Sequence, residues 1–182
     1  MPVMARDFIM NDEARSLQRE FFRIDEDVID RVQHLKSRLM KYAETALETV
    51  FDHLIGNPDV AHYFEITDNI TYLRAGMLAH CDELFSARFD EHYYEATEGM
   101  GERHAKLEFP AHVYTAAYSN MFARIVELAM ADRRSFKTDD ITALSRITHY
   151  DIELSMGAFY RHIMDKRAAL SSDAQKIRHL VD

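Results

Sequence analysis

The stretch from residue 99 to residue 114 reads Gly-Met-Gly-Glu-Arg-His-Ala-Lys-Leu-Glu-Phe-Pro-Ala-His-Val-Tyr. It contains two helix-breaking signals, the glycines at 99 and 101 and the Phe109-Pro110 pair. Proline is tolerated in the first turn of a helix, where its missing N–H costs nothing. Pro110 therefore predicts the start of a helix, and His104 lies near the end of the helix before it.

On both sides of this stretch, apolar residues recur every three or four positions, which predicts amphipathic helices. Asp25 and Asp90 are expected N-caps, as is Thr67 or Asp68. The expected helical segments are 12–22, 25–54 with a joint near 36–40, 59–64, 67 or 68 to 85, 90–104, 110–131 and about 140–170, the last running out at Ser171-Ser172-Asp173 before a weak amphipathic tail.

The composition agrees with an all-α fold. The chain has 182 residues, of which 47% are hydrophobic and 29% charged, as in an ordinary globular domain. Only 5 glycines and 3 prolines are present, too few for the many tight turns of a β-sandwich or a Rossmann-type sheet. We predict one all-α domain of seven or eight helices.

The net charge and the N-terminal sequence argue against nucleic-acid binding, membrane binding and secretion. A formal net charge of −9 repels nucleic acids and anionic membrane surfaces. No stretch approaches the ~20 apolar residues of a membrane span, and Asp7, Asp12 and Glu13 interrupt any signal peptide. With the single cysteine Cys81, these features predict a cytoplasmic protein without disulfides.

Most catalytic and metal-binding patterns are missing. No two of the ten histidines are four residues apart, so a helical zinc pair is not expected. His80 and Cys81 are adjacent and point to different faces of a helix, which disfavours a thiolate–imidazole dyad. The remaining feature is His104, with Phe51, Leu73 and Met77 as an apolar wall upstream. One imidazole facing such a wall can bind a flat apolar macrocycle through an axial bond.

Four stretches occur in the order of a known family. They are Val50-Phe-Asp-His-Leu-Ile-Gly-Asn-Pro-Asp, Leu84-Phe-Ser-Ala-Arg-Phe-Asp-Glu-His-Tyr, Met100-Gly-Glu-Arg-His-Ala-Lys-Leu-Glu-Phe-Pro and Val113-Tyr-Thr-Ala-Ala-Tyr. Over residues 24–166 the chain resembles the globin domain of globin-coupled sensors, the bacterial haem-based gas sensors.

The resemblance implies a globin-like fold with an extra N-terminal helix. It implies residues 1–24 as an extension, 25–166 as the sensor globin domain and 167–182 as a linker helix or tail. Haem b would be the cofactor and His104 its proximal metal ligand. The cofactor-contacting residues would be Phe51, Phe64, Leu73, Met77 and Tyr114.

The distal side departs from the family pattern. Many of these sensors read Phe-Tyr-Asp-His where this chain has Val50-Phe51-Asp52-His53. Phe51 lacks the hydroxyl that donates to bound O₂, so we expect weak O₂ binding and comparatively good CO and NO binding.

Several roles remain open. Tyr114 either hydrogen-bonds near the proximal histidine or packs in the core. Met77 either fills the pocket or binds the iron as a sixth ligand. His80 is the second candidate for that ligand. Arg74, Arg103 and Lys106 are alternative partners for the haem propionates.

The resemblance implies a sensor domain that binds a diatomic gas and signals to an output domain or partner. Relatives pair through their last two helices, here residues 110–131 and 140–166, so a homodimer is expected. No kinase, cyclase or methyl-accepting motif follows Lys166, so any catalytic output lies outside the chain. The second hypothesis is a haem-free globin-like interaction module. The third is a haem enzyme.

Overall fold

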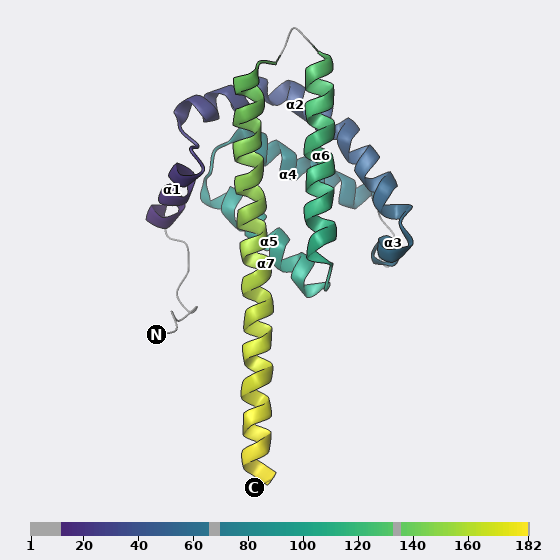
Figure 1. Cartoon of the computed structure of the whole chain (residues 1–182), viewed down its shortest axis with the longest axis vertical. Helices are drawn as coiled ribbons and strands as arrows, with labels where there is room; N and C mark the ends of the chain where they lie inside the picture. The colour runs from purple at the N-terminus through teal and green to yellow at the C-terminus, as the bar shows by residue number, and fades with distance from the viewer. Residues whose placement is uncertain (1–11, 66–69, 133–135, 182) are drawn as a thin grey trace.

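The computed structural model describes residues 12–65, 70–132 and 136–181, with side chains up to residue 171 apart from that of residue 65. Within these residues all regular structure is helical (Figure 1). The helices are α1 (Asp12–Phe21), α2 (Glu26–Ile55), α3 (Pro58–Glu65), α4 (Ile70–Ser86), α5 (Glu91–Lys106), α6 (Ala111–Ala131) and α7 (Thr138–Val181). The predicted all-α class is confirmed, with seven helices in the described part of the chain.

Local sequence signals fix three of the predicted helix starts. The Asp25 carboxylate accepts the Val28 N–H at 3.0 Å, and Asp90 accepts the Tyr93 N–H at 3.0 Å. α6 begins directly after Pro110. The other expected caps, Thr67 and Asp68, lie outside the described residues.

α2 is one helix of 30 residues, so the predicted joint near residues 36–40 is wrong. No Gly or Pro occurs between Glu26 and Ile55, and the buried stripe continues without a change of phase. At the expected joint, Lys36 extends to α4, where its ammonium donates to Asp82 at 2.9 Å and to the Ser86 hydroxyl at 2.7 Å. The long buried stripe and these contacts favour one continuous helix.

α7 has 44 residues and passes through Ser171-Ser172-Asp173, so the predicted end there is wrong. Ser and Asp cost only a few tenths of a kcal/mol each, up to about 0.7, in a helix interior. No Gly or Pro follows Gly157 to stop the helix. The C-terminal part of α7 therefore extends well beyond the body of the domain (Figure 1).

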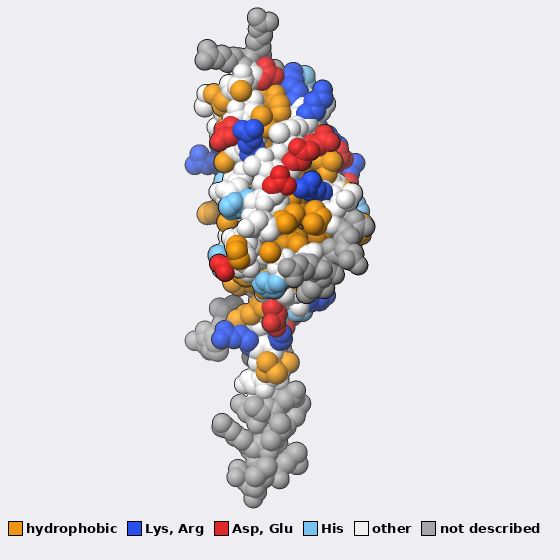
Figure 2. Space-filling view, turned by 90° about the vertical axis from the view of Figure 1, so that its right-hand side faces the viewer, with side chains coloured by type: hydrophobic (Ala, Val, Ile, Leu, Met, Phe, Trp, Pro, Cys, Tyr) orange, Lys and Arg blue, Asp and Glu red, His pale blue; other side chains and the backbone are white. Residues whose placement is uncertain are grey.

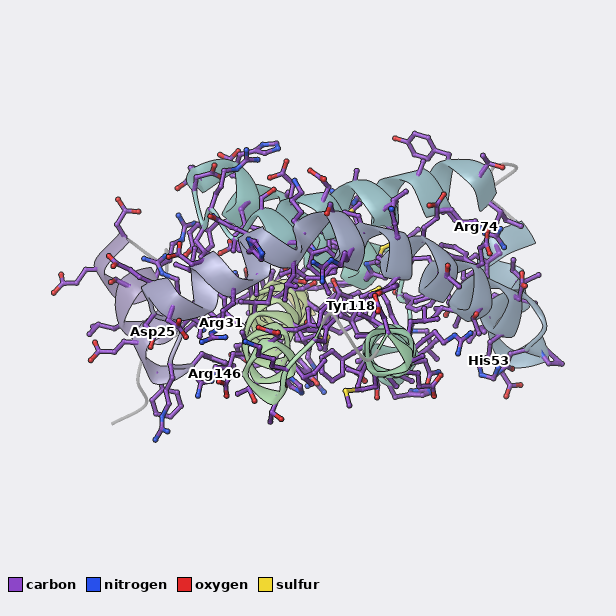
Figure 3. All side chains as sticks on the ribbon, turned by 90° about the horizontal axis from the view of Figure 1, so that it is seen from above. Asp25, Arg31, His53, Arg74, Tyr118 and Arg146 are labelled. Carbon is purple, nitrogen blue, oxygen red and sulfur yellow. The ribbon has the colours of Figure 1, made fainter. Side chains whose placement is uncertain are left out.

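The helices form a layered body. α6 and α7 run antiparallel side by side, and α2 crosses behind them (Figure 1). α4 packs mainly on α2, whereas α5 packs mainly on α7, and α4 has little contact with α5. Seen from above, α2 and α4 form a layer across one side of the α6–α7 pair (Figure 3).

Gly101 allows the close packing of α5 against α7. A Cβ atom at this position would lie 2.8 Å from the Ser155 carbonyl carbon and 3.2 Å from the Phe159 nitrogen. It would also overlap the Ser155 carbonyl oxygen. Because these are backbone atoms, no rotamer change can relieve the overlap, and the two helices would have to separate.

We expect Gly101→Ala to destabilise the domain by about 1–3 kcal/mol, as overpacking typically does. The control is Gly157→Ala in α7, where the added Cβ meets only the end of the Arg161 side chain at 3.4 Å. That substitution should stabilise the domain by roughly 0.5–1 kcal/mol through helix propensity. Urea denaturation measures both, and equal effects of the two variants would contradict the packing argument.

Candidate functional site

His104 is fixed by the way in which α5 ends. The Phe109 N–H donates to the His104 carbonyl at 3.0 Å, and the Glu108 N–H donates to the Ala105 carbonyl at 3.1 Å. Glu108 adopts a left-handed conformation with φ 54°. These are the features of a Schellman motif, in which an apolar contact between the two outer residues is common. Here that contact joins the Phe109 and His104 rings, whose centroids are 5.4 Å apart.

One nitrogen of His104 is engaged and the other is not. Nδ1 lies 2.8 Å from the Met100 carbonyl oxygen, which can only accept, so Nδ1 donates. Nε2 has no hydrogen-bond partner among the described residues and keeps its lone pair. Burial lowers the pKa of His104, and nearby Arg103 lowers it further, which favours the neutral imidazole.

Tyr114 packs against the imidazole and does not hydrogen-bond to it. The ring centroids of His104 and Tyr114 are 4.7 Å apart with the planes at 64°. The Tyr114 hydroxyl donates to Ser155 Oγ of α7 at 2.7 Å. The Tyr114 ring therefore packs on the imidazole, while its hydroxyl reaches Ser155 and lies 3.8 Å from the Met100 sulfur.

The predicted apolar wall comes from α2 and α4, and Phe64 of α3 packs beside it. Phe51 of α2 is 5% exposed, and its ring contacts that of Phe64 in α3 at 6.2 Å between centroids. Leu73 and Met77 are one turn apart on α4, and both are half-buried against the core. The structure thus joins Phe51 to Phe64 and His104 to Tyr114 through ring contacts.

Two of the basic residues considered for carboxylate binding are already paired. Arg74 of α4 donates to Asp52 at 3.0 Å, although its Nε is buried without a partner. Arg74 and His53 lie at the same end of the body (Figure 3). Lys106 pairs with Glu102 at 3.5 Å. Arg103 is exposed beside His104 and has no ion-pair partner in the described part of the chain.

This arrangement suits a group that needs a single protein ligand. A neutral imidazole with a free Nε2 is a metal donor, and its Nδ1–H bond to a carbonyl is the usual way of orienting a ligating histidine. No group of three or more His, Cys, Asp or Glu residues gathers as a metal site in the described segments. A single imidazole therefore fits a metal whose other ligands come from a cofactor, such as the iron of a porphyrin.

A sequence profile of the protoglobin family matches residues 11–163. The chain belongs to the protoglobin family. The structure is similar to the globin domain of the Geobacter sulfurreducens globin-coupled sensor, with a TM-score of 0.69 and 17% sequence identity, covering 80% of this chain and 97% of that chain. At this identity the likeness shows the shared globin-like fold. Comparison with curated protein sequences gives no significant match.

The surface of this protoglobin mixes both signs of charge. On the face shown in Figure 2, hydrophobic side chains are exposed at several places among acidic and basic ones. Within the described residues, no helix combines the length and apolarity needed to cross a membrane. The formal charge of −9 is thus not gathered into one acidic surface on this face.

Sequence reasoning missed a buried polar cluster centred on Asp151 of α7. Asp151 is 0% exposed. Its Oδ1 accepts the Tyr93 hydroxyl at 2.9 Å and the Thr97 hydroxyl at 3.3 Å. Its Oδ2 accepts His80 Nε2 at 2.9 Å and the Tyr118 hydroxyl at 2.8 Å. Tyr118 lies inside the body, between α6 and the α2–α4 layer (Figure 3).

The cluster bears on the possible sixth iron ligand. His80 Nε2 is committed to Asp151, which leaves Met77 as the remaining candidate on α4. Cys81, next to His80, is 0% exposed, and burial raises the pKa of its thiol to about 12. Cys81 is therefore a buried thiol, which agrees with the expectation that it forms no reactive dyad with His80.

His80 and Asp151 form a charged pair. Burial lowers the pKa of His80, but the Asp151 carboxylate outweighs it, so the pKa is raised overall. Burial raises the pKa of Asp151, but His80 and the hydroxyls of Tyr118 and Tyr93 lower it overall. Both directions favour an imidazolium facing a carboxylate in the core.

This pair predicts a pH-dependent stability. Because the folded state holds the His80 proton more tightly, the stabilisation is complete below the ordinary histidine pKa of about 6.5 and is lost as pH rises through the raised value. In that window the free energy of unfolding should fall by up to about 1.4 kcal/mol per pH unit. Urea denaturation at a series of pH values measures this slope.

His80→Gln should remove the slope, because glutamine does not titrate. His34→Gln is the control, since His34 is exposed on α2. Parallel profiles for the wild type and His80→Gln would contradict the assignment.

Proposed function

We propose that this chain binds haem b through His104 and acts as a gas-sensing globin domain. The observation that carries the proposal is the His104 imidazole, oriented by the Met100 carbonyl and left with a free Nε2. The protoglobin membership supports the same cofactor. Any catalytic output would lie outside the chain.

The proximal side is built to hold His104 in one orientation. The Met100 carbonyl fixes the tautomer. Nδ1 carries the proton, and Nε2 carries the lone pair that would bind the iron. The rings of Phe109 and Tyr114 restrict rotation of the imidazole. Haem, when bound, supplies an iron with one coordination position open for a gas.

The distal side would be formed by Phe51, Phe64, Leu73 and Met77. None of these side chains has an O–H or N–H to donate. The pocket would therefore give little stabilisation to a polar ligand such as O₂, whereas CO and NO need no donor. Met77 is the chain's candidate for a sixth ligand when no gas is present, although filling the pocket is the common use of methionine.

The propionates would be met by the basic side chains near the two walls. Arg103 is adjacent to His104 and exposed without an ion-pair partner among the described residues. Arg74 has a buried Nε without a partner. Arg74 pairs with Asp52 and Lys106 with Glu102, so we infer that Arg103 is the best placed of the three and that Arg74, with its spare Nε, comes next.

We infer that the signal leaves through α6 and α7 in a homodimer. The outer side of this helix pair has two shallow grooves, and exposed apolar side chains continue along α7. The residues involved include Phe122, Ile152, Met130, Ile141, Tyr160 and Met164. Residues 25–166 would be the sensor domain, 1–24 an extension and 167–182 a linker helix to an output domain or partner protein.

The haem proposal is tested by His104→Ala. We expect the purified protein, supplied with hemin, to show a Soret band that shifts when the reduced form meets CO, because the imidazole binds iron. His104→Ala should lose or alter this spectrum, and added imidazole should restore it in His104→Gly. His112→Ala, at an exposed position on α6, should leave it unchanged.

A protein that stays colourless with hemin would overturn the proposal and favour the haem-free interaction module. An unaltered spectrum in His104→Ala would overturn the assignment of the ligand.

The character of the distal side is tested by Phe51→Tyr. The added hydroxyl would donate to an oxygen molecule in the pocket, a bond worth about 1.5–3 kcal/mol. We expect O₂ affinity to rise by roughly 10- to 100-fold, with CO affinity changed much less. Gas-binding titrations of the reduced protein measure both, and a wild type that already binds O₂ tightly would contradict an apolar pocket.

A further inference from the structure

The Asp151 carboxylate is the meeting point of four helices. It belongs to α7, and it accepts hydrogen bonds from His80 of α4, from Tyr93 and Thr97 of α5, and from Tyr118 of α6. Each oxygen accepts two bonds, so all four lone pairs are used. A fully buried carboxylate with this many partners is held in one place.

The bond to His80 links two helices that otherwise barely meet. α4 packs mainly on α2 and has few contacts with α7 or α5. The His80–Asp151 pair, at 2.9 Å, is a charged contact in the middle of that sparse interface. This pair is therefore a direct link from α4 to α7, beside the indirect one through α2, which packs on both helices.

The proximal side reaches α7 one turn further along. Ser155, four residues after Asp151, accepts the Tyr114 hydroxyl at 2.7 Å, and the Tyr114 ring packs on His104. Tyr114 and Tyr118 are also in ring contact, with centroids 5.1 Å apart. Adjacent turns of α7 thus receive one contact from α4, through His80, and one from the surroundings of His104, through Tyr114.

Stability alone gives a weak reason for such a cluster. Buried ion pairs are often no more stabilising than apolar residues of the same volume, because both charges lose their hydration. What the pair adds is two discrete states, intact or broken, and coupling between distant sites requires such an element.

We propose that Asp151 couples the distal helix α4 to α7, so that a shift of α4 on gas binding is passed to α7 through the His80–Asp151 pair. This inference rests on the proposed haem and gas binding. It assigns to Asp151 a positioning role, since the carboxylate bonds to His80, Tyr93, Thr97 and Tyr118 and not to His104, the proposed haem ligand.

The test is hydrogen exchange of the α7 amides in reduced, haem-loaded protein with and without CO. In the wild type we expect exchange rates around residues 147–159 to change on CO binding by roughly 2- to 30-fold, the range that coupled networks produce. Asp151→Asn and His80→Gln should bind CO as the wild type does but lose most of that change. A purely structural role would speed exchange equally in both states and leave the CO-dependent ratio intact.

Asp140→Asn is the matched control. Asp140 is also a buried acid of α7, and it accepts Arg31 at 3.4 Å and the Lys137 N–H at 2.8 Å, away from α4 and α5. This variant should keep the wild-type response. If Asp151→Asn fails to fold, Tyr118→Phe and Thr97→Val remove one donor each at nearly constant size and should reduce the response.

The outcomes separate the two proposals. A protein without a Soret band refutes the haem proposal, and the coupling with it. A protein that binds haem and CO refutes the coupling alone if the wild type shows no CO-dependent change in α7. The same holds if Asp151→Asn and His80→Gln retain the change, or if Asp140→Asn loses it equally.

Discussion

The hydrogen bond from His104 Nδ1 to the Met100 carbonyl is the constraint on which the candidate site depends. It selects one tautomer, and the Schellman end of α5 places the Phe109 ring beside the imidazole at the same time. The backbone turns into the left-handed conformation at Glu108, the residue after the C-cap Leu107. A histidine in the middle of α5 would have the same carbonyl available but no aromatic residue folded back against it.

The orientation of His104 depends in turn on how closely α5 approaches α7. Gly101 permits backbone contact with Ser155, and this brings the Ser155 hydroxyl within reach of Tyr114. Tyr114 then has its polar end in α7 and its ring against the imidazole. Gly101 on α5 thus determines that Tyr114 on α6 bonds to Ser155. The Tyr114 ring in turn restricts the rotation of the His104 imidazole.

Local signals predicted much of the fold, whereas contacts between distant helices were not predictable from sequence. The caps at Asp25 and Asp90 act over three residues, and both were expected from the sequence. The Asp151 cluster was missed because the partners of its carboxylate lie 33 to 71 residues away in the chain, so no local pattern marks them. The continuity of α2 and α7 was missed because polar residues such as Ser171 weaken a helical pattern without ending the helix.

Several buried hydroxyl groups of the chain bond to Asp151, and none of these bonds reaches the residues of the apolar wall. Tyr93, Thr97 and Tyr118 donate to Asp151, while Phe51 on α2 has no hydroxyl to donate. Under the proposed function, gas affinity is then set mainly from α2 and signal transfer mainly from α7. Two properties that rest on different helices can change independently, because substitutions at positions that share no partner have nearly additive effects. A donor introduced at residue 51 would alter which gas is bound while the His80–Asp151 pair continued to link α4 to α7.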